Sequence, residues 1–371
     1  MMFYCKRCVM PNTKPGLTID SEGICSACRS VEKKKEINWE QRKIKFQNLC
    51  NEIKRNNKGV YDCVVPVSGG KDSIYQVYMM SKIYKMKTLG IVVPSHLQTF
   101  EGISNLNALV ENLNIDLIKV LVRPSTQKKL RRFGLFELGN PNFAEHRVIF
   151  AGVARTALLY NAPLVVWGED IAFEFGGNIS ESSKNDGSAE DLINNDLFQK
   201  KDFHQFINGR IDDKELFFYQ FPEKEELQNR KIKSIYLGYY HWWDGLKHFN
   251  IAKKFGFQPR RYGPLKGNWL TYDNIDEKLC ELHIWFKFLK FGFWRPTDQC
   301  CYHIWNGYLS REDAVKIVLE KQYEFPSDYF EEFLEYHQIT KDEFIECENK
   351  YRNKDIWHKV NGEWRLKNEV T

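Results

Sequence analysis

One run of the sequence, at residues 68–73, combines residue types that bind phosphate. It consists of Ser68, Gly69, Gly70, Lys71, Asp72 and Ser73. Glycines let the backbone approach a ligand closely, and the N–H groups of such a turn and of the helix after it can surround an anion. The hydroxyls can donate hydrogen bonds, the lysine supplies a positive charge, and the aspartate could hold Mg²⁺. A tight turn capped by Ser and Asp is the alternative, and the spacing of a Walker P-loop is absent.

Four cysteines have the spacing of metal ligands. They form two pairs, Cys5-x₂-Cys8 and Cys25-x₂-Cys28. Two such pairs can place four thiolates around one Zn²⁺, and four protein ligands leave no open position, so the site is predicted to be structural. A redox or sulfur-carrying role for the pairs stays open. The other six cysteines have no ligand spacing and are expected mostly in the core.

A second pair of chemically useful residues follows an apolar run at 164–168. Glu169 and Asp170 are candidates for metal binding or acid–base catalysis. Capping of a helix is an equal alternative for Asp170.

These groups need elements that bring them together. Short β-branched runs at 62–67, 88–93, 117–122 and 164–168 alternate with helical patterns at 73–85, 102–112 and 145–160. This alternation is typical of βαβ units on a parallel sheet. The run 68–73 then follows the first strand, and Glu169 and Asp170 lie at the carboxyl end of the fourth, where open α/β sheets bind ligands.

The chain is predicted to have four regions, which make an α/β fold with a parallel sheet, a zinc-binding N-terminal segment and a helical C-terminal region. Residues 1–30 form the four-cysteine segment, 31–59 a connecting helix, 60–200 the α/β domain, and 201–371 a helical, aromatic-rich region for substrate or partner. Lysines 33–35 are expected on a solvated helix face. Residues 176–191 are expected to form a mobile loop, and the chain is expected to be helical from about 203.

Composition excludes several classes of protein. The chain has 371 residues, 43% hydrophobic and 28% charged, with a formal net charge of +5. This excess is too small to indicate nucleic-acid binding. No run approaches the about 18 apolar residues of a membrane span, and the N-terminus lacks a signal-peptide core. We therefore expect a cytoplasmic protein, in which ten cysteines do not form disulfides.

The run 68–73 resembles the PP-loop of the ATP pyrophosphatase superfamily, whose members cleave ATP between the α and β phosphates. Several other segments of the chain resemble a known family pattern: the string at 4–16, which contains the first cysteine pair, and the blocks at 243–245, 251–257, 290–293 and 297–299. Together they resemble the N-acetyl sugar amidotransferase family of surface-polysaccharide and pseudaminic acid biosynthesis. The resemblance spans nearly the whole chain.

The resemblance implies that an amide becomes an amidine. An acetamido oxygen of a nonulosonic acid or a UDP-diacetamido uronic acid would attack the α-phosphate of ATP, and pyrophosphate would leave into the loop. Ammonia would then attack the O-adenylyl imidate, and AMP would depart. Developing charge on phosphate would be stabilised by backbone N–H groups, by Lys71, and by Mg²⁺ held at Asp72 and Asp170.

The source of ammonia is expected outside this chain, because the sequence shows no convincing glutaminase motif. The resemblance implies a separate glutaminase subunit, with or without a cyclase-like subunit. In the segment before the helix at 145–160, where related proteins often have further cysteines, this chain has none.

Five residues are weaker candidates for contacts with the substrate. His146 and Arg147 begin a predicted helix and could contact an anion, although a surface capping cluster is equally expected. His241 and Asp244 flank Trp242-Trp243 and could meet a sugar, whereas a structural role is the default for the histidine. Asp298 lies in a polar stretch that a turn between helices explains as well.

Two other functions remain open. A tRNA thiolation enzyme also combines a PP-loop with a zinc ribbon and adenylates a base carbonyl. It would be expected to carry a Cys-x-x-Cys in its catalytic core, where this chain has only Cys63. A non-catalytic assembly partner is the second alternative, and the intact run at 68–73 argues against it.

Overall fold

The computed structural model describes residues 1–170, 174, 186–193, 207 and 209–371. Most of the loop predicted at 176–191 lies outside these residues. None of the described helices combines the length and the apolar character that a membrane crossing requires.

A five-stranded parallel sheet forms the centre of the α/β part, in the order β3-β2-β1-β4-β5. Its strands are short and bounded as follows: β1 (Cys63–Pro66), β2 (Thr88–Val92), β3 (Asp116–Lys119), β4 (Leu164–Trp167) and β5 (Lys233–Tyr236). Every residue of β2 and β4 is buried, as expected for strands covered on both faces. The predicted parallel α/β fold is confirmed.

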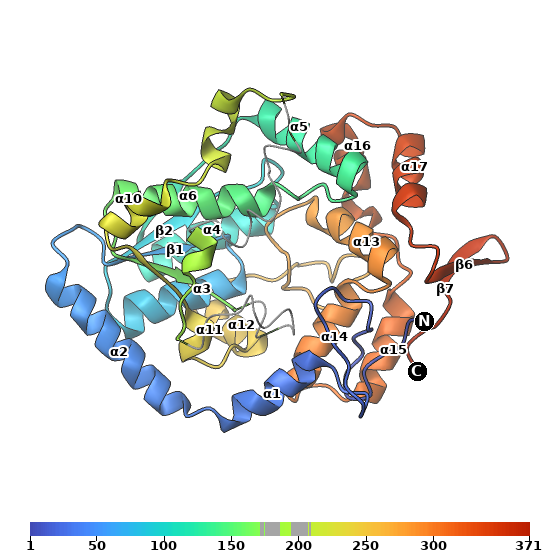
Figure 1. Cartoon of the computed structure of the whole chain (residues 1–371), viewed down its shortest axis with the longest axis horizontal. Coiled ribbons are helices and arrows are strands. Elements are labelled where there is room, and N and C mark those ends of the chain that lie inside the picture. The colour runs from blue at the N-terminus through green and yellow to red at the C-terminus, as the bar shows by residue number, and fades with distance from the viewer. Residues whose placement is uncertain (171–173, 175–185, 194–206, 208) are drawn as a thin grey trace.

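Helices cover both faces of the sheet (Figure 1). Alternate side chains of β1 enter different cores: Cys63 and Val65 pack with the helices that follow β1 and β2, and Val64 packs with the helix that precedes β4. The flanking elements are α3 (Lys71–Tyr78) with η1 (Met79–Ile83), α4 (Phe100–Leu113), α5 (Pro124–Phe133) with η2 (Gly134–Leu138), α6 (Glu145–Leu159), α8 (Glu190–Ile193), η4 (Asp213–Tyr219) and α10 (Lys224–Asn229).

The predicted connecting helix consists of two helices, α1 (Ser26–Glu36) and α2 (Trp39–Asn56). The chain leaves the helical conformation at Ile37, and Asn38 caps α2 through its side chain. Figure 1 shows the pair running from the cysteine segment around the outside of the molecule to the sheet. The expectation of a fully solvated lysine face is corrected at Lys34, which is buried.

The region beyond 201 is largely helical, but it also supplies strands. After β5 come α11 (Leu237–Tyr240), α12 (Gly245–Lys253), α13 (Cys280–Phe291), α14 (Arg295–Trp305), α15 (Arg311–Lys321), η5 (Ser327–Tyr329), α16 (Phe330–His337), α17 (Lys341–Tyr351) and the hairpin β6 (Trp357–Val360) and β7 (Glu363–Leu366). The expectation that the chain is helical from about 203 is therefore wrong for β5 and for the hairpin. β5 completes the sheet on which the site is built.

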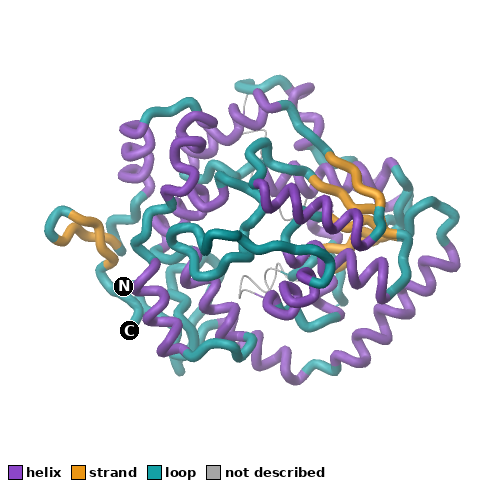
Figure 2. Tube along the Cα trace, turned by 180° about the vertical axis from the view of Figure 1, so that it is seen from behind, coloured by secondary structure: helices purple, strands orange, loops and turns teal. Residues whose placement is uncertain are grey.

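The two ends of the chain lie side by side (Figure 2). The Tyr4 hydroxyl donates to the carbonyl of Asn368 at 3.3 Å, and the Asn368 amide donates to the carbonyl of Met2 at 3.1 Å. The cysteine segment thus packs against the C-terminal helices and joins their apolar core.

Candidate active site and metal centre

The PP-loop lies between β1 and α3, as predicted. Gly69 has φ +90°, and a Cβ there would lie 2.6 Å from the carbonyl oxygen of Gly102, so the turn requires glycine. The Gly70 N–H donates to Ser68 Oγ at 3.2 Å, and Ser73 Oγ donates to the carbonyl of Gly70 at 2.9 Å. These contacts fix the loop at the start of α3, where the helix dipole favours an anion.

Lys71 is held between two carboxylates. Its Nζ lies 3.0 Å from Asp72 Oδ2 and 2.7 Å from Asp273 Oδ1. Burial alone would lower the pKa of Lys71, but Asp273 and Asp72 outweigh it and raise the pKa above its ordinary value. Burial would likewise raise the pKa of Asp72, but Lys71 and His248, whose Nδ1 is 2.7 Å from Asp72 Oδ1, hold it well below its usual range.

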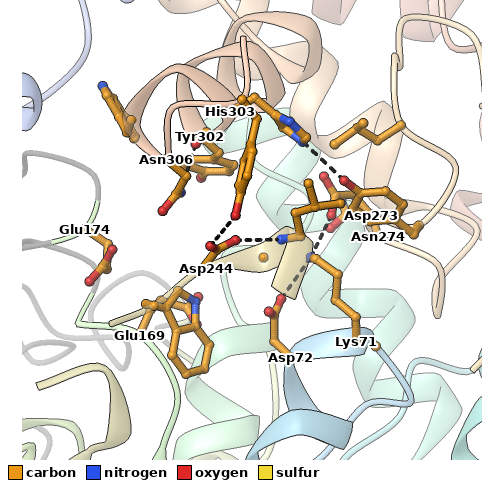
Figure 3. A pocket seen from close by; sticks show the side chains of 18 of the residues that line it. Lys71, Asp72, Glu169, Glu174, Asp244, Asp273, Asn274, Tyr302, His303 and Asn306 are labelled. Carbon is orange, nitrogen blue, oxygen red and sulfur yellow. Dashed lines mark hydrogen bonds and ion pairs between the residues drawn. The ribbon is translucent and has the colours of Figure 1, made fainter. Parts of the chain in front are cut away.

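The loop opens into a pocket of about 300 Å³ (Figure 3). The rest of its wall comes largely from the C-terminal region and is rich in aromatic rings and hydrogen-bonding groups. These residues include Trp242, Trp243, Tyr272, Asp273, Asn274, Asp276, Arg295, Tyr302, His303, Trp305, Asn306 and Tyr308. The pocket is therefore shared between the α/β part and the helical part.

Asp244 lies in this pocket, as its predicted role requires. Its Oδ1 caps α12 by accepting from the N–H groups of Leu246 and Lys247, both at 3.1 Å. Its Oδ2 accepts from the Tyr308 hydroxyl at 2.7 Å. The carboxylate is thereby fixed close to the PP-loop (Figure 3).

Two further carboxyl groups line the pocket, Glu169 after β4 and Glu174. Burial, reinforced by the charge of Asp72, raises the pKa of Glu169 to about 7. Burial also raises the pKa of Glu174 to about 7, although its ion-pair partner Lys34 acts in the opposite direction. A carboxyl group that titrates near neutrality is suited to proton transfer.

The other predicted site residues lie outside the pocket lining. Asp170 is buried and lies close enough to Tyr236 and Glu174 to interact with them electrostatically. His241 Nε2 is 2.7 Å from the Tyr84 hydroxyl, in the core beneath α2.

The remaining three candidates are also placed elsewhere. His146 is exposed in the first turn of α6, and Arg147 Nε donates to the carbonyl of Tyr219 at 2.7 Å. Asp298 pairs with Lys287 at 2.5 Å. Contact of these side chains with a substrate stays a prediction that the geometry does not favour.

Sequence reasoning missed several residues of the site. Asp273 is 202 positions from its partner Lys71, and His248 is 176 positions from Asp72. No local motif marks either one. The polar string at 272–276, between apolar segments, was the available signal for Asp273.

The four predicted metal ligands converge. Their sulfur atoms all lie within 4.8 Å of one another, and all four residues are buried. The distance from Cys5 Sγ to Cys28 Sγ is 3.9 Å, and that from Cys8 Sγ to Cys25 Sγ is 3.6 Å. A tetrahedral ion with metal–sulfur bonds of about 2.3 Å requires sulfur–sulfur distances of about 3.8 Å, so the residues fit one metal ion.

Comparison with known proteins gives one family match and one curated relative. Residues 233–371 match the family described as "LPS biosynthesis protein WbpG-like, C-terminal domain". An uncharacterized protein of Methanocaldococcus jannaschii is 25% identical over 170 residues. That alignment covers 46% of this chain and 60% of the length of the relative.

Three solved structures are similar in part. The NH3-dependent NAD synthetase of Campylobacter jejuni is 15% identical, with a TM-score of 0.28, over 50% of this chain and 99% of that one. The NMN synthetase of Francisella tularensis is 16% identical, with a TM-score of 0.29, over 55% of this chain and 93% of that one. The U34-tRNA thiolase of Methanococcus maripaludis is 15% identical, with a TM-score of 0.27, over 82% of this chain and 85% of that one.

The matched region begins with β5, at the edge of the sheet, and continues through the helices that form the aromatic wall. The PP-loop at the end of β1 and the four converging cysteines were the other parts of the predicted resemblance, and both are present. The comparison therefore supports the predicted resemblance over this part of the chain: residues 233–371 match the model of the WbpG-like family of lipopolysaccharide biosynthesis proteins.

Proposed function

We propose that the protein is an ATP-dependent ligase that converts an N-acetyl group of a sugar into an acetamidino group. The observation that carries the proposal is the single pocket in which the PP-loop faces an aromatic, hydrogen-bonding wall from the WbpG-like region. Aromatic faces suit the C–H surfaces of a sugar ring, and carboxylate and amide groups suit its hydroxyls. The match to a lipopolysaccharide family is consistent with a nonulosonic acid or a UDP-linked diacetamido uronic acid.

In the first step, the acetamido oxygen attacks the α-phosphorus of ATP. The new bond joins this oxygen to phosphorus, the bond between the α-phosphorus and the bridging oxygen breaks, and pyrophosphate leaves. The N–H groups of the loop, the hydroxyls of Ser68 and Ser73, and the Lys71 ammonium group would stabilise the departing charge. Mg²⁺ would accompany the nucleotide at Asp72 and neutralise charge on phosphate.

In the second step, ammonia forms a bond to the imidate carbon. The bond from that carbon to the adenylyl oxygen breaks, and AMP leaves with the bonding electrons. Forming the neutral imidate in the first step releases the amide proton, whereas the amidine formed in the second step is a strong base and keeps the protons that ammonia brings. Glu169 lines the pocket and has a pKa of about 7, so it is our candidate to accept a proton.

The nitrogen would come from a glutaminase subunit, with or without a cyclase-like subunit. A glutaminase acting through cysteine needs a nucleophilic thiol, and no cysteine lines this pocket. The same observation argues against tRNA thiolation through a cysteine in the core. We therefore keep a thiolase only as an outcome of the test.

The metal in the cysteine centre is proposed to be zinc. The short sulfur–sulfur distances suit one ion, whereas the ligands of an iron–sulfur cluster bind several iron atoms. With four protein ligands the ion has no open position, so it would stabilise the fold rather than bind substrate.

Mass spectrometry of the purified protein tests the proposed reaction. The mixture contains ATP, Mg²⁺, ¹⁵N-labelled ammonium and a panel of acetamido sugars that includes nonulosonic acids and UDP-linked diacetamido uronic acids. We expect one sugar to exchange an oxygen for a labelled nitrogen while AMP and pyrophosphate form in equal amounts. ATP consumption that instead requires tRNA and a sulfur donor would replace the proposal with the thiolase, and no binding of ATP would support the non-catalytic partner.

A further inference from the structure

Helix α1 connects the cysteine centre to the pocket. Cys25 caps the helix, and its Sγ accepts from the Cys28 N–H at 3.4 Å. Val31 and Lys34 follow Cys28 at intervals of three residues, and both line the pocket. Residues three apart lie on neighbouring turns of one helix face. The position of the metal ligands therefore sets the position of this part of the pocket wall.

Helix α14 makes a second connection, at its C-terminal end. The indole N–H of Trp305 donates to Cys28 Sγ at 3.3 Å, and Trp305 is 8% exposed and lines the pocket. Its neighbour Asn306 accepts a hydrogen bond from Trp242 Nε1 at 2.9 Å. When Cys28 is a metal-bound thiolate, the bond from Trp305 is charge-assisted and therefore stronger and more directional.

Helix α1 and the C-terminal end of α14 reach the side of the pocket that lies across from Lys71. Figure 3 shows Glu174, Tyr302 and Asn306 across the pocket from Lys71 and Asp273. Lys34 and Glu174 form an ion pair, with side chains 5% and 6% exposed. Among the described residues Glu174 Oε1 has no hydrogen-bond partner. A buried acceptor of this kind would be satisfied by a hydroxyl or an amide N–H of a ligand.

We propose that the metal centre positions the acceptor side of this pocket through Trp305 and α1, so that metal occupancy controls affinity for the N-acetyl sugar and leaves ATP binding nearly unchanged. This rests on the function proposed above. The PP-loop is held instead by β1, α3 and the contact of Gly69 with α4. Trp305 is thus a positioning residue that acts through the second coordination sphere of the metal.

The substitution Trp305→Phe tests the connection, because it removes the N–H donor and keeps an aromatic ring. We expect one metal ion per chain to remain, the thiolate-to-metal charge-transfer band of the Co²⁺-substituted protein to shift, and the KM for the acceptor sugar to rise about 10-fold. The KM for ATP should change less than about twofold. Trp364→Phe, on the hairpin strand β7, is the matched control and should change none of these values.

Three results would overturn the proposal: an equal rise in both KM values, an unchanged KM for the sugar despite a shifted band, or a raised KM for the sugar with an unshifted band, which would assign the effect to direct contact of the Trp305 ring with the sugar. If no sugar in the panel reacts even with the unaltered protein, the proposed function fails, and hydrogen exchange decides the coupling separately. Removal of the metal should then reduce the protection of backbone amides against exchange at 26–36 and 295–308 and preserve that protection at 63–78. Equal loss at all three segments, or no loss at the first two, would refute the coupling.

Discussion

Lys71 already contacts Asp72 and Asp273 at 3.0 and 2.7 Å. A phosphate that enters the loop must therefore compete with two carboxylates for the ammonium group, or share it with them. The pairing keeps Lys71 fully charged, because it raises the pKa of the amine. The same carboxylates would repel a triphosphate, which is a physical reason to expect Mg²⁺ with the nucleotide.

Replacing Lys71 with methionine is expected to lower kcat for AMP formation at least about 100-fold, because the site loses a preorganised positive charge that stabilises the leaving pyrophosphate. The measurement is release of pyrophosphate at saturating ATP. Lys316→Met is the matched control, since the side chain of Lys316 is 76% exposed on α15 and forms its ion pair with Asp313, three residues away. An active Lys71→Met variant would remove the lysine from the mechanism.

From the pKa of Glu169 we expect the rate of amidine formation to depend on pH. Its pKa of about 7, raised chiefly by burial and then by Asp72, means that the carboxylate forms only as the pH passes through 7. If Glu169 accepts a proton, kcat for amidine formation should rise through pH 7 and level off above about pH 8. Glu169→Gln should lower kcat and abolish this rise. A rise that persists in the variant would assign it to another group.

The raised pKa of Glu169 also makes the stability of the fold depend on pH. A carboxyl group whose pKa is higher in the folded protein than in the unfolded chain stabilises the fold fully below its unfolded value of 4.5, and this contribution is lost as the pH rises through 7. Glu169→Gln should therefore increase the free energy of unfolding at pH 8 by about 1–3 kcal/mol and leave it unchanged at pH 4. Urea denaturation at the two pH values measures the difference.

At the scale of the residue, the sequence identified the candidate groups that are contiguous in the chain. The six residues of the PP-loop and the two Cys-x₂-Cys pairs could be recognised because the members of each run are neighbours in the sequence. Asp273 and His248 could not be predicted, since only the folded chain brings them to Lys71 and Asp72. His241 was a reasonable candidate by its neighbours, but it packs against Tyr84 in the core.

At the scale of the element, helix α1 shows why a charge pattern can mislead. Lys33 and Lys35 are exposed as the pattern predicts, whereas Lys34 between them is buried with Glu174. A helix that packs on two sides has little solvated face, and periodicity alone does not show this. β5 was missed for a similar reason, because a run of four residues is too short for its side-chain periodicity to distinguish a strand from a helix.

The turn from β1 to α3 depends on Gly69. Gly69→Ala should destabilise the protein by about 2 kcal/mol or more, because the residue has φ +90° and the new methyl group would meet the carbonyl of Gly102 at 2.6 Å. It should also weaken ATP binding. Gly362→Ala is the control: its φ is +85°, no atom lies within 4 Å of the new methyl group, and we expect a cost of only about 1 kcal/mol. Thermal unfolding and ATP titration measure both effects.

At the scale of the whole molecule, the cysteine centre joins the two ends of the chain. Its residues share one buried cluster with side chains of α14, α15 and Val370. A chelator, or Cys8→Ser, should therefore lower the Tm by about 10 °C and leave less than one zinc ion per chain. Cys280→Ser should retain the metal and the Tm. A metal-free protein with an unchanged Tm would contradict the structural role.

The bond between Trp305 and Cys28 spans 277 residues. Ribosomes add roughly 5–20 residues per second, so the cysteines emerge about 15–55 s before the helix that shields them. During that interval the nascent thiols are open to oxidation and to incorrect metals. Capture of zinc while the chain is still being made would protect them, and the cell's supply of zinc would then limit how much protein matures correctly.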